Sequence, residues 1–190
     1  GGIAEFHVPA LKAAGFNVVS CCGSPKSIRA KNFGAKHNIE KVYNDYNQSL
    51  DDINNWDCVL IASSVETTFP ILKKFLKTNK PILVEKPVST NPAELHTLGN
   101  DLNHVIVAYN RRFYSTTQYA KDFINHNSPC QIKLELPDSI DFSVSKKTQS
   151  FFSVRENSVH GFDLLSYSLL NIYVKKNRCQ IRSEERRVGK

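Results

Sequence analysis

Short apolar runs recur along residues 1–110, and most of them lack the polar alternation of a strand with one exposed face. Strands that are covered on both faces of a sheet are typically apolar throughout. The sequence therefore predicts buried strands at 17–22, 41–43, 57–62, 82–84 and 104–109.

Between these runs, apolar residues recur at the spacing of a helix. It is clearest over 3–14, which ends at Gly15, and over 66–76. Ser24 and Pro25 are expected to cap and open a helix that continues to about residue 35, and Asn91 with Pro92 to open another. Strands that alternate with helices predict an α/β fold with a doubly wound parallel sheet, the Rossmann arrangement.

The pattern changes from residue 131. Residues 131–136 (QIKLEL) and 139–144 (SIDFSV) alternate with period two, which predicts half-exposed antiparallel strands. A helix is expected at 158–170, with an apolar stripe formed by Val159, Phe162, Leu165 and Leu169. We therefore expect a Rossmann domain over 1–113 and the start of an α/β domain with an antiparallel sheet over 114–181.

Both ends of the sequence predict a gene fragment. The 190-residue chain contains no methionine and opens on two glycines, so we expect the first Rossmann strand and the later part of the second domain to be missing. Residues 182–190 (RSEERRVGK) resemble the translation of a sequencing adapter, and we expect them to be an artefact tail.

Composition excludes several classes of protein. The net charge of +7 is spread along the chain among acidic residues, which argues against nucleic-acid binding. No apolar run approaches the roughly 20 residues that cross a bilayer, so we expect a cytoplasmic protein without membrane contact. The five cysteines form no CxxC pair and indicate neither a metal site nor a disulfide framework.

Lys86 is the first candidate for chemistry, because it follows the apolar strand 82–84. Open α/β sheets bind ligands beyond the carboxyl ends of their strands. Glu85 and Lys86 are adjacent in an extended segment and should point to opposite sides, so the carboxylate need not neutralise the ammonium. A solvated lysine at the end of a strand is the simpler interpretation of these residues alone.

Glycines at the start of the chain indicate a nucleotide site. Gly1, Gly2 and Ala4 match the rear of a GxGxxA fingerprint, in which backbone amides at a helix N-terminus approach a pyrophosphate, although a glycine pair can also be a plain turn. After strand 17–22, where NAD sites usually carry an acid, the chain has Gly23, Ser24, Pro25 and Lys26. We therefore expect NADP, with NAD as the alternative.

His160 is the candidate general acid or base. Glu156 lies four residues before it and Asp163 three residues after it, so all three can share one helix face. An imidazole beside a carboxylate suits proton transfer near neutral pH. A lone helical histidine on a polar surface is the alternative interpretation.

In combination, these residues resemble the Gfo/Idh/MocA oxidoreductase family. The similar stretches follow the family's order and are GGIAEFH (1–7), VLIAS (59–63), LVEKPVSTNPAEL (83–95), VAYNRRF (107–113) and VHGFDLL (159–165). The resemblance implies that Lys86 sits beside the nicotinamide and substrate, that Glu85 lies near the nicotinamide ribose, and that the Lys86–Pro87 bond is often cis. Together with Ser24 and Lys26, which the residues after strand 17–22 suggest, the expected cofactor-binding residues are Gly1, Gly2, Ile3, Ala4, Ala62, Ser63, Glu85, Lys86, Asn110 and Arg112.

The function that the resemblance implies is hydride transfer between NAD(P) and a carbohydrate-like alcohol or its ketone. We expect the reaction to belong to sugar or surface-polysaccharide biosynthesis, with a sugar or polyol as the substrate. We expect the full-length protein to be a homo-oligomer. Lys86 and His160 are expected to meet at one site, with Glu156 or Asp163 orienting the imidazole. A non-catalytic dinucleotide-binding regulator and a redox-inactive carrier of sugar ligands remain alternatives.

The chain departs from the family pattern in three places. Ser64 and Thr68 stand where members often have a proline and a histidine. Glu156 replaces the usual aspartate ahead of the histidine, and Gly23 lacks the acid of NAD users. The change at Ser64 and Thr68 concerns the cofactor contacts. The change at Glu156 concerns the proton relay, and the change at Gly23 concerns the identity of the cofactor.

Overall fold

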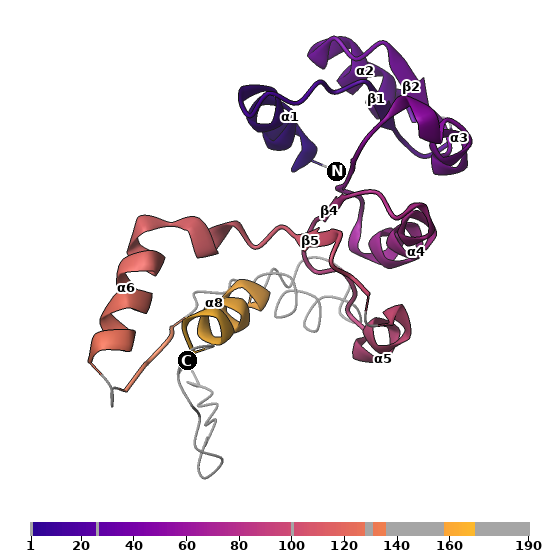
Figure 1. Cartoon of the computed structure of the whole chain (residues 1–190). Helices are drawn as coiled ribbons and strands as arrows, with labels where there is room; N and C mark the ends of the chain where they lie inside the picture. The colour runs from indigo at the N-terminus through magenta and orange to yellow at the C-terminus, as the bar shows by residue number, and fades with distance from the viewer. Residues whose placement is uncertain (1, 26, 100, 128–130, 136–157, 170–190) are drawn as a thin grey trace, which may run out of the picture. The chain divides into compact units, whose positions relative to one another are not determined.

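The computed structural model of the chain describes residues 2–25, 27–99, 101–127, 131–135 and 158–169 (Figure 1). Described residues up to Tyr109 belong to one compact unit, and those of Asn110–Pro137 and His160–Lys190 belong to a second. Each unit is described by itself below. The domain boundary expected at 113/114 stays a prediction.

Helices and parallel strands alternate through the first unit, as the sequence predicts. The helices are α1 (Ala4–Ala13), α2 (Ile28–His37), α3 (Tyr46–Asp51), α4 (Val65–Phe75) and α5 (Pro92–Leu95). The strands are β1 (Ser20–Cys22), β2 (Lys41–Tyr43), β3 (Val59–Ile61), β4 (Ile82–Val84) and β5 (Val105–Val107). Short 3-10 helices occupy Ile53–Asn55, Leu76–Thr78 and His96–Leu98. Each strand lies where the sequence predicts it; β2 and β4 have the predicted bounds, and the other three are shorter than their apolar run.

The strands form two parallel sheets. Strand β1 pairs with β2, and β4 lies between β3 and β5 with Val84 opposite Ile61 on one side and Val107 on the other. Within the described residues no pairing joins β1 to β3. In the doubly wound order 3-2-1-4-5-6, the space between these two strands belongs to the first strand.

The core of the first unit lies where α4 covers β3 and β4. Leu72 and Phe75 of α4 pack with Ile61, Ile82 and Val84, and these five side chains are buried. Trp56 closes the cluster, and its indole Nε1 donates to the carbonyl of Ser49 at 2.8 Å. Ile82 and Val84 point to one face of β4 and Leu83 to the other, where it is half-buried, so the predicted burial of strand 82–84 is confirmed in full on one face only.

Helix α2 begins later than the sequence predicts. Its N-cap is Ser27, whose hydroxyl accepts from the amide of Ala30 at 3.3 Å, so the cap assigned to Ser24 is wrong. The amide of Ser27 instead donates to the carbonyl of Ser24 at 3.0 Å and closes a turn. Proline fits the second position of such a turn as well as the first turn of a helix, which is why the local sequence allowed both.

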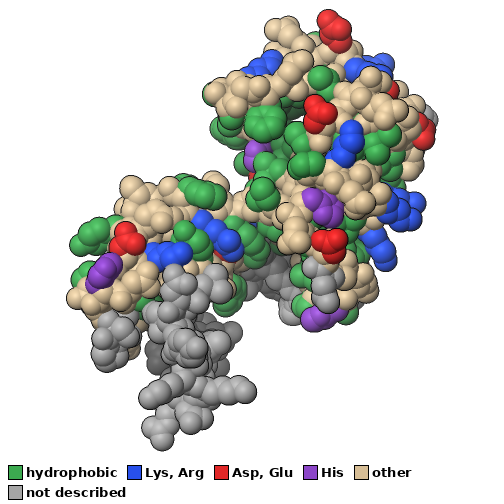
Figure 2. Space-filling model, in the orientation of Figure 1, with side chains coloured by type: hydrophobic (Ala, Val, Ile, Leu, Met, Phe, Trp, Pro, Cys, Tyr) green, Lys and Arg blue, Asp and Glu red, His purple; other side chains and the backbone are tan. Residues whose placement is uncertain are grey.

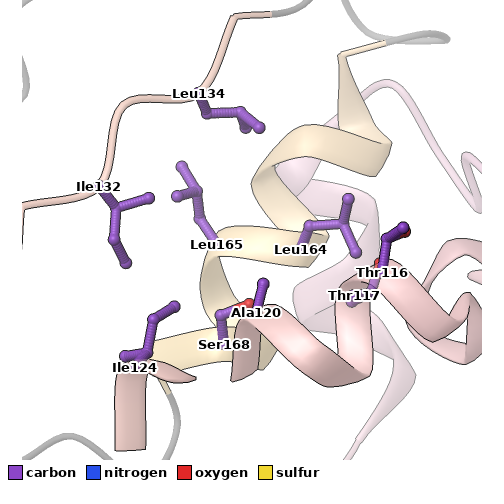
Figure 3. Close-up of a pocket in the computed structure, with 9 residues that line it drawn as sticks. All are labelled: Thr116, Thr117, Ala120, Ile124, Ile132, Leu134, Leu164, Leu165 and Ser168. Atoms are coloured by element: carbon purple, nitrogen blue, oxygen red, sulfur yellow. The ribbon is translucent and has the colours of Figure 1, made fainter. Parts of the chain in front are cut away.

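The second unit contains the 3-10 helix Asn110–Phe113, α6 (Ser115–His126) and α8 (Val159–Leu169). Gln118 of α6 donates to the hydroxyl of Tyr167 of α8 at 3.0 Å, and the ammonium of Lys121 lies 3.7 Å from the centre of that ring. An apolar recess of about 200 Å³ lies beside α6. Ile132, Leu134 and Leu165 are among the residues that line it (Figure 3).

Residues 131–135 are described without strand pairing, so the strand predicted at 131–136 is not observed there. Their period-two pattern still has a structural counterpart, because Ile132 and Leu134 line the recess while Lys133 and Glu135 pair with each other at 2.5 Å. A strand needs a partner for its backbone groups, and 139–144 lies outside the described residues. The expected apolar stripe of α8 is also wrong in part, since Phe162 is 63% exposed.

A polar network joins β2 to the segment after α3. The carboxylate of Asp52 accepts from the ammonium of Lys41, the hydroxyl of Tyr43 and the side-chain amide of Asn55. These hydrogen bonds, with that from Lys41 first, lower the pKa of Asp52 to about 2. Because the pKa is lowered by folding, the network stabilises the folded state above the ordinary value of 3.8, and this contribution is lost as the pH falls toward 2.

We expect the Asp52→Asn variant to lose less stability on acidification than the unmodified chain. The amide cannot be ionised, so its contribution does not change between pH 4 and pH 2. Urea unfolding followed by circular dichroism at several pH values measures the difference. The exposed neighbour Asp51 provides the matched Asp51→Asn control, and equal acid sensitivity of the two variants would contradict the prediction.

Candidate functional site

Residues at the carboxyl ends of β3, β4 and β5 lie in register along one edge of the sheet. The amide of Glu85 donates to the carbonyl of Ile61 at 2.9 Å, and the amide of Ala108 donates to that of Val84 at 2.9 Å. Ala62, Glu85 and Ala108 therefore follow neighbouring strand ends. This edge is where open α/β sheets bind ligands.

Lys86 leaves this edge directly after β4, and its side chain is half-buried. The Lys86–Pro87 peptide bond is cis, as the resemblance implied. Glu85 holds the segment through both carboxylate oxygens, because Oε1 lies 2.6 Å from Nε2 of His7 and Oε2 accepts from the Lys86 amide at 3.1 Å. The structure thus presents Lys86 at the edge where the sequence predicted it.

The N-terminus of α1 carries the predicted phosphate-binding residues. Its N-cap is Ile3, whose side chain caps no amide, while the amides of Glu5 and Phe6 donate to the carbonyls of Gly2 and Ile3 at 3.2 and 3.0 Å. A Cβ added at Gly2 would meet no protein atom within 4 Å. Open space at the N-terminus of a helix fits the approach of a pyrophosphate, and Gly2, Ile3 and Ala4 would hold it. Gly1 lies outside the described residues.

Gly23 follows β1 and is required there by packing. A Cβ at this position would overlap the Cβ of Ala30 in α2, so in this chain a side chain cannot be added here unless α2 shifts. Ser24 comes next and is exposed, so its hydroxyl is available to a ligand, whereas Lys26 lies outside the described residues. The carboxyl end of β1 therefore offers a hydroxyl where NAD users place a carboxylate.

Asp45 is a carboxylate near this end of β1, but it has a structural task. Its side chain accepts from the backbone amide and the side-chain amide of Asn47, both at 2.9 Å, and so caps α3. Cys22 is exposed at its surface, but partial loss of solvent around the thiol, then the charge of Asp45, then Cys21 raise its pKa to about 11. Cys22 is therefore a thiol rather than a thiolate at neutral pH and is no nucleophile.

Hydroxyl groups line the start of α4 after β3. The hydroxyl of Ser63 lies 2.9 Å from that of Thr68, which is 2% exposed and also donates to the carbonyl of Ser64 at 2.9 Å. Thr68 stands where family members often have a histidine, so this chain replaces an imidazole with a buried hydroxyl. The cofactor contact expected of Ala62 and Ser63 stays a prediction.

Arg112 and Asp163 bind each other in the second unit. The guanidinium Nε donates to both carboxylate oxygens at 3.0 and 2.9 Å, and Nη2 donates to Oδ1 as well. The Asp163 side chain is only 4% exposed. The sequence assigned Arg112 to the cofactor and Asp163 to catalysis, and their direct pairing was not foreseen.

His160 of α8 is buried at 7% exposure, so it is not the polar surface residue of the simpler interpretation. Glu156, its expected partner, lies outside the described residues. Asn110 opens the 3-10 helix that carries Arg112. Of the predicted residues, the structure brings Glu85 and Lys86 together in the first unit and Arg112 and Asp163 together in the second. The meeting of Lys86 with His160 stays a prediction.

Two kinds of site find no support in the described part of the chain. It contains no group of three or more histidine, cysteine or acidic side chains that could hold a metal ion. None of its helices has the length and apolar character needed to cross a membrane. Figure 2 shows the Lys and Arg side chains of the first unit in separate groups on the visible face, with Asp and Glu among them.

Fold and edge residues together define a dinucleotide-binding Rossmann unit of an oxidoreductase. The family model described as "Oxidoreductase family, NAD-binding Rossmann fold" matches residues 1–111. Since this match covers more than half of the chain, the protein belongs to the Gfo/Idh/MocA family. The fold class predicted from the sequence is confirmed.

Known relatives support the same family at low identity. Myo-inositol 2-dehydrogenase of Thermotoga maritima is 23% identical over 174 residues, which cover 88% of this chain and 52% of that protein. A similar solved structure is that of Lactobacillus casei myo-inositol dehydrogenase with NAD(H) and myo-inositol. The match covers 89% of this chain and 52% of the dehydrogenase chain, at a TM-score of 0.72 and 19% identity.

A third relative is the WlbA dehydrogenase of Bordetella pertussis, solved with NADH and UDP-GlcNAcA. The match covers 65% of this chain and 40% of the WlbA chain, at a TM-score of 0.56 and 17% identity. At such identities the solved structures show the shared fold alone. The chain spans about half the length of the curated relatives that it matches.

Proposed function

We propose that the complete protein is an NADP(H)-dependent dehydrogenase that interconverts a polyol or sugar alcohol and its ketone. The observation that carries the proposal is the position of Glu85, Lys86 and Pro87 directly after β4, at the ligand-binding edge of the sheet. The named activities of relatives, which act on inositol or bind a sugar nucleotide with NAD(H), support the substrate class.

Nicotinamide, when bound, supplies or accepts a hydride at the substrate carbon. The chain itself must manage the proton of the substrate hydroxyl. His160 would take this proton during oxidation and return it during reduction, and the Lys86 ammonium would stabilise the charge that develops on the oxygen. Gly2, Ile3, Ala4, Ser24 and Lys26 would hold the phosphates, and Glu85 the nicotinamide ribose.

We assign the orientation of the His160 ring to Glu156 rather than Asp163. The Asp163 carboxylate already accepts three hydrogen bonds from Arg112, which leaves it committed to the guanidinium. Glu156, four residues before His160, can reach the same helix face. Asp163 would then hold Arg112 in place.

Turnover of cofactor tests the proposed reaction. The complete protein, recovered from its reading frame, should reduce NADP+ in the presence of an inositol or a sugar alcohol from a panel of such compounds. The absorbance of reduced nicotinamide measures the rate. Tight dinucleotide binding without turnover on any compound would instead support the non-catalytic regulator.

A preference for NADPH over NADH is expected from Ser24 and the absence of an acid at Gly23. We expect Ser24→Asp to weaken NADPH binding roughly 10–100-fold, since a carboxylate repels the 2′-phosphate and removes a hydrogen bond to a charged group. NADH binding should not weaken. Ser24 is the position to change, because a side chain at Gly23 would overlap Ala30.

Titration calorimetry with each dinucleotide measures these affinities. The neutral Ser24→Asn variant is the matched control, because it adds the same bulk without the charge. Tighter binding of NADH than NADPH by the unmodified complete protein would contradict the expected cofactor.

A further inference from the structure

His7 makes a contact that joins α1 to the segment after β4. Its Nε2 lies 2.6 Å from Oε1 of Glu85, and the two side chains are 20% and 14% exposed. A carboxylate has no hydrogen to donate, so Nε2 of His7 is the donor in this contact when the ring is in the tautomer with hydrogen on Nε2. The two residues lie 78 positions apart, so the contact depends on the tertiary fold.

Glu85 is held at three points by this arrangement. Its amide donates to the carbonyl of Ile61 at 2.9 Å, Oε2 accepts from the amide of Lys86 at 3.1 Å, and Oε1 is bound by His7. With both oxygens bound, the carboxylate has little freedom to rotate. Its orientation in turn restrains the backbone that carries Lys86.

The other end of the contact leads to the start of α1. The amide of His7 donates to the carbonyl of Ile3 at 3.3 Å, so His7 lies one turn after Ile3, the N-cap of α1. One side chain therefore connects the proposed phosphate-binding end of α1 with the proposed nicotinamide end of the site.

We propose that His7 is a positioning residue that holds the Glu85 carboxylate, and through it the Lys86 backbone, ready for the dinucleotide. This inference rests on the proposed function. The chain also offers a matched contact with no link to Glu85. On the same helix, Glu5 accepts from Nε2 of His37 at 2.9 Å and from Lys36 at 2.7 Å, which ties α1 to α2.

Three variants of the complete protein test the proposal: His7→Leu, His7→Gln and His37→Leu. Leucine removes the donor, and we expect NADPH binding to weaken roughly 10-fold, because a hydrogen bond to a charged group orients a binding carboxylate. Glutamine carries a donor near the position of Nε2 and should restore most of the affinity. His37→Leu removes a similar contact of α1 and should bind NADPH normally.

Hydrogen exchange of the Lys86 amide provides a second readout that general destabilisation of α1 would not reproduce. This amide donates to Glu85, so its exchange should accelerate about 10-fold in His7→Leu and stay unchanged in His37→Leu. Equal NADPH affinity and equal exchange in the two leucine variants would overturn the role of His7 while leaving the proposed function intact. Absence of dinucleotide binding by the unmodified protein would overturn both.

If His7→Leu does not fold, the unmodified protein decides the matter. Nitrogen-15 spectra of the histidine rings report which ring nitrogen carries hydrogen. We expect hydrogen on Nε2 of His7, with a resonance that shifts in the Glu85→Gln variant. Hydrogen on Nδ1 alone would overturn the proposal, because Nε2 could not then donate to Glu85.

Discussion

Replacing Lys86 with alanine in the complete protein is expected to lower turnover roughly 10²–10⁴-fold, which is the usual cost of losing a positioned acid or base. Lys86 is the second residue after β4, at the end of the sheet where open α/β folds bind ligands. Dinucleotide binding should remain largely intact, since Gly2, Ile3 and Ser24 would still hold the phosphates. Steady-state rates and NADPH titrations measure the two effects separately.

His160→Asn is expected to reduce turnover by the same order, because asparagine cannot exchange a proton near neutral pH. Exposed residues of the same types provide the controls, namely Lys74→Ala in α4 and His126→Asn in α6. Asp163→Asn should reduce turnover less than either, since its carboxylate binds Arg112. Unchanged turnover in Lys86→Ala or His160→Asn would contradict the proposed proton transfer, because members of one relay are not individually dispensable.

A strand placed between β1 and β3 is expected to raise the stability of residues 1–190 substantially. Among the described residues, each of these strands pairs on one side only, and Val19 beside β1 is exposed. Unpaired strand edges leave backbone donors and acceptors without partners in the sheet. We therefore expect the chain as it stands to unfold at low denaturant concentration and with weak cooperativity.

The test adds an apolar strand of about five residues and a glycine-containing turn ahead of Gly1. Urea unfolding should then show a higher midpoint and a larger dependence on denaturant, since more surface is buried in the folded state. An extension of the same length that contains proline cannot join the sheet and serves as the control. Equal unfolding curves for the two extensions would show that the two sheets need no strand between them.

Local patterns determined most of the first unit. Apolar runs predicted all five strands, and Asn91 was correctly assigned as the cap of α5, where its side chain accepts from the Ala93 amide at 3.1 Å. These features depend on neighbours in the sequence or on burial of both faces of a strand, so they can be read without the fold. The position of Lys86 after a buried strand followed for the same reason.

Where two residues suit the same structural role equally well, only the tertiary structure shows which one fills it. Ser24 and Ser27 can both cap a helix, and the packing of Gly23 against Ala30 accompanies the choice of Ser27. The stripe of α8 failed at Phe162 because helical spacing does not reveal which face meets a neighbour.

Partners of the charged site residues were also beyond the sequence. Asp163 shares a helix face with His160, yet its carboxylate binds Arg112, which is 51 positions away, and Glu85 binds His7 across 78 positions. Hydrogen bonds of this kind form wherever folding brings a donor to an acceptor, and no local periodicity records them. The sequence by itself determined the family, the positions of the strands along the chain and the candidate residues, whereas only the three-dimensional arrangement decided which of those residues hold one another in place.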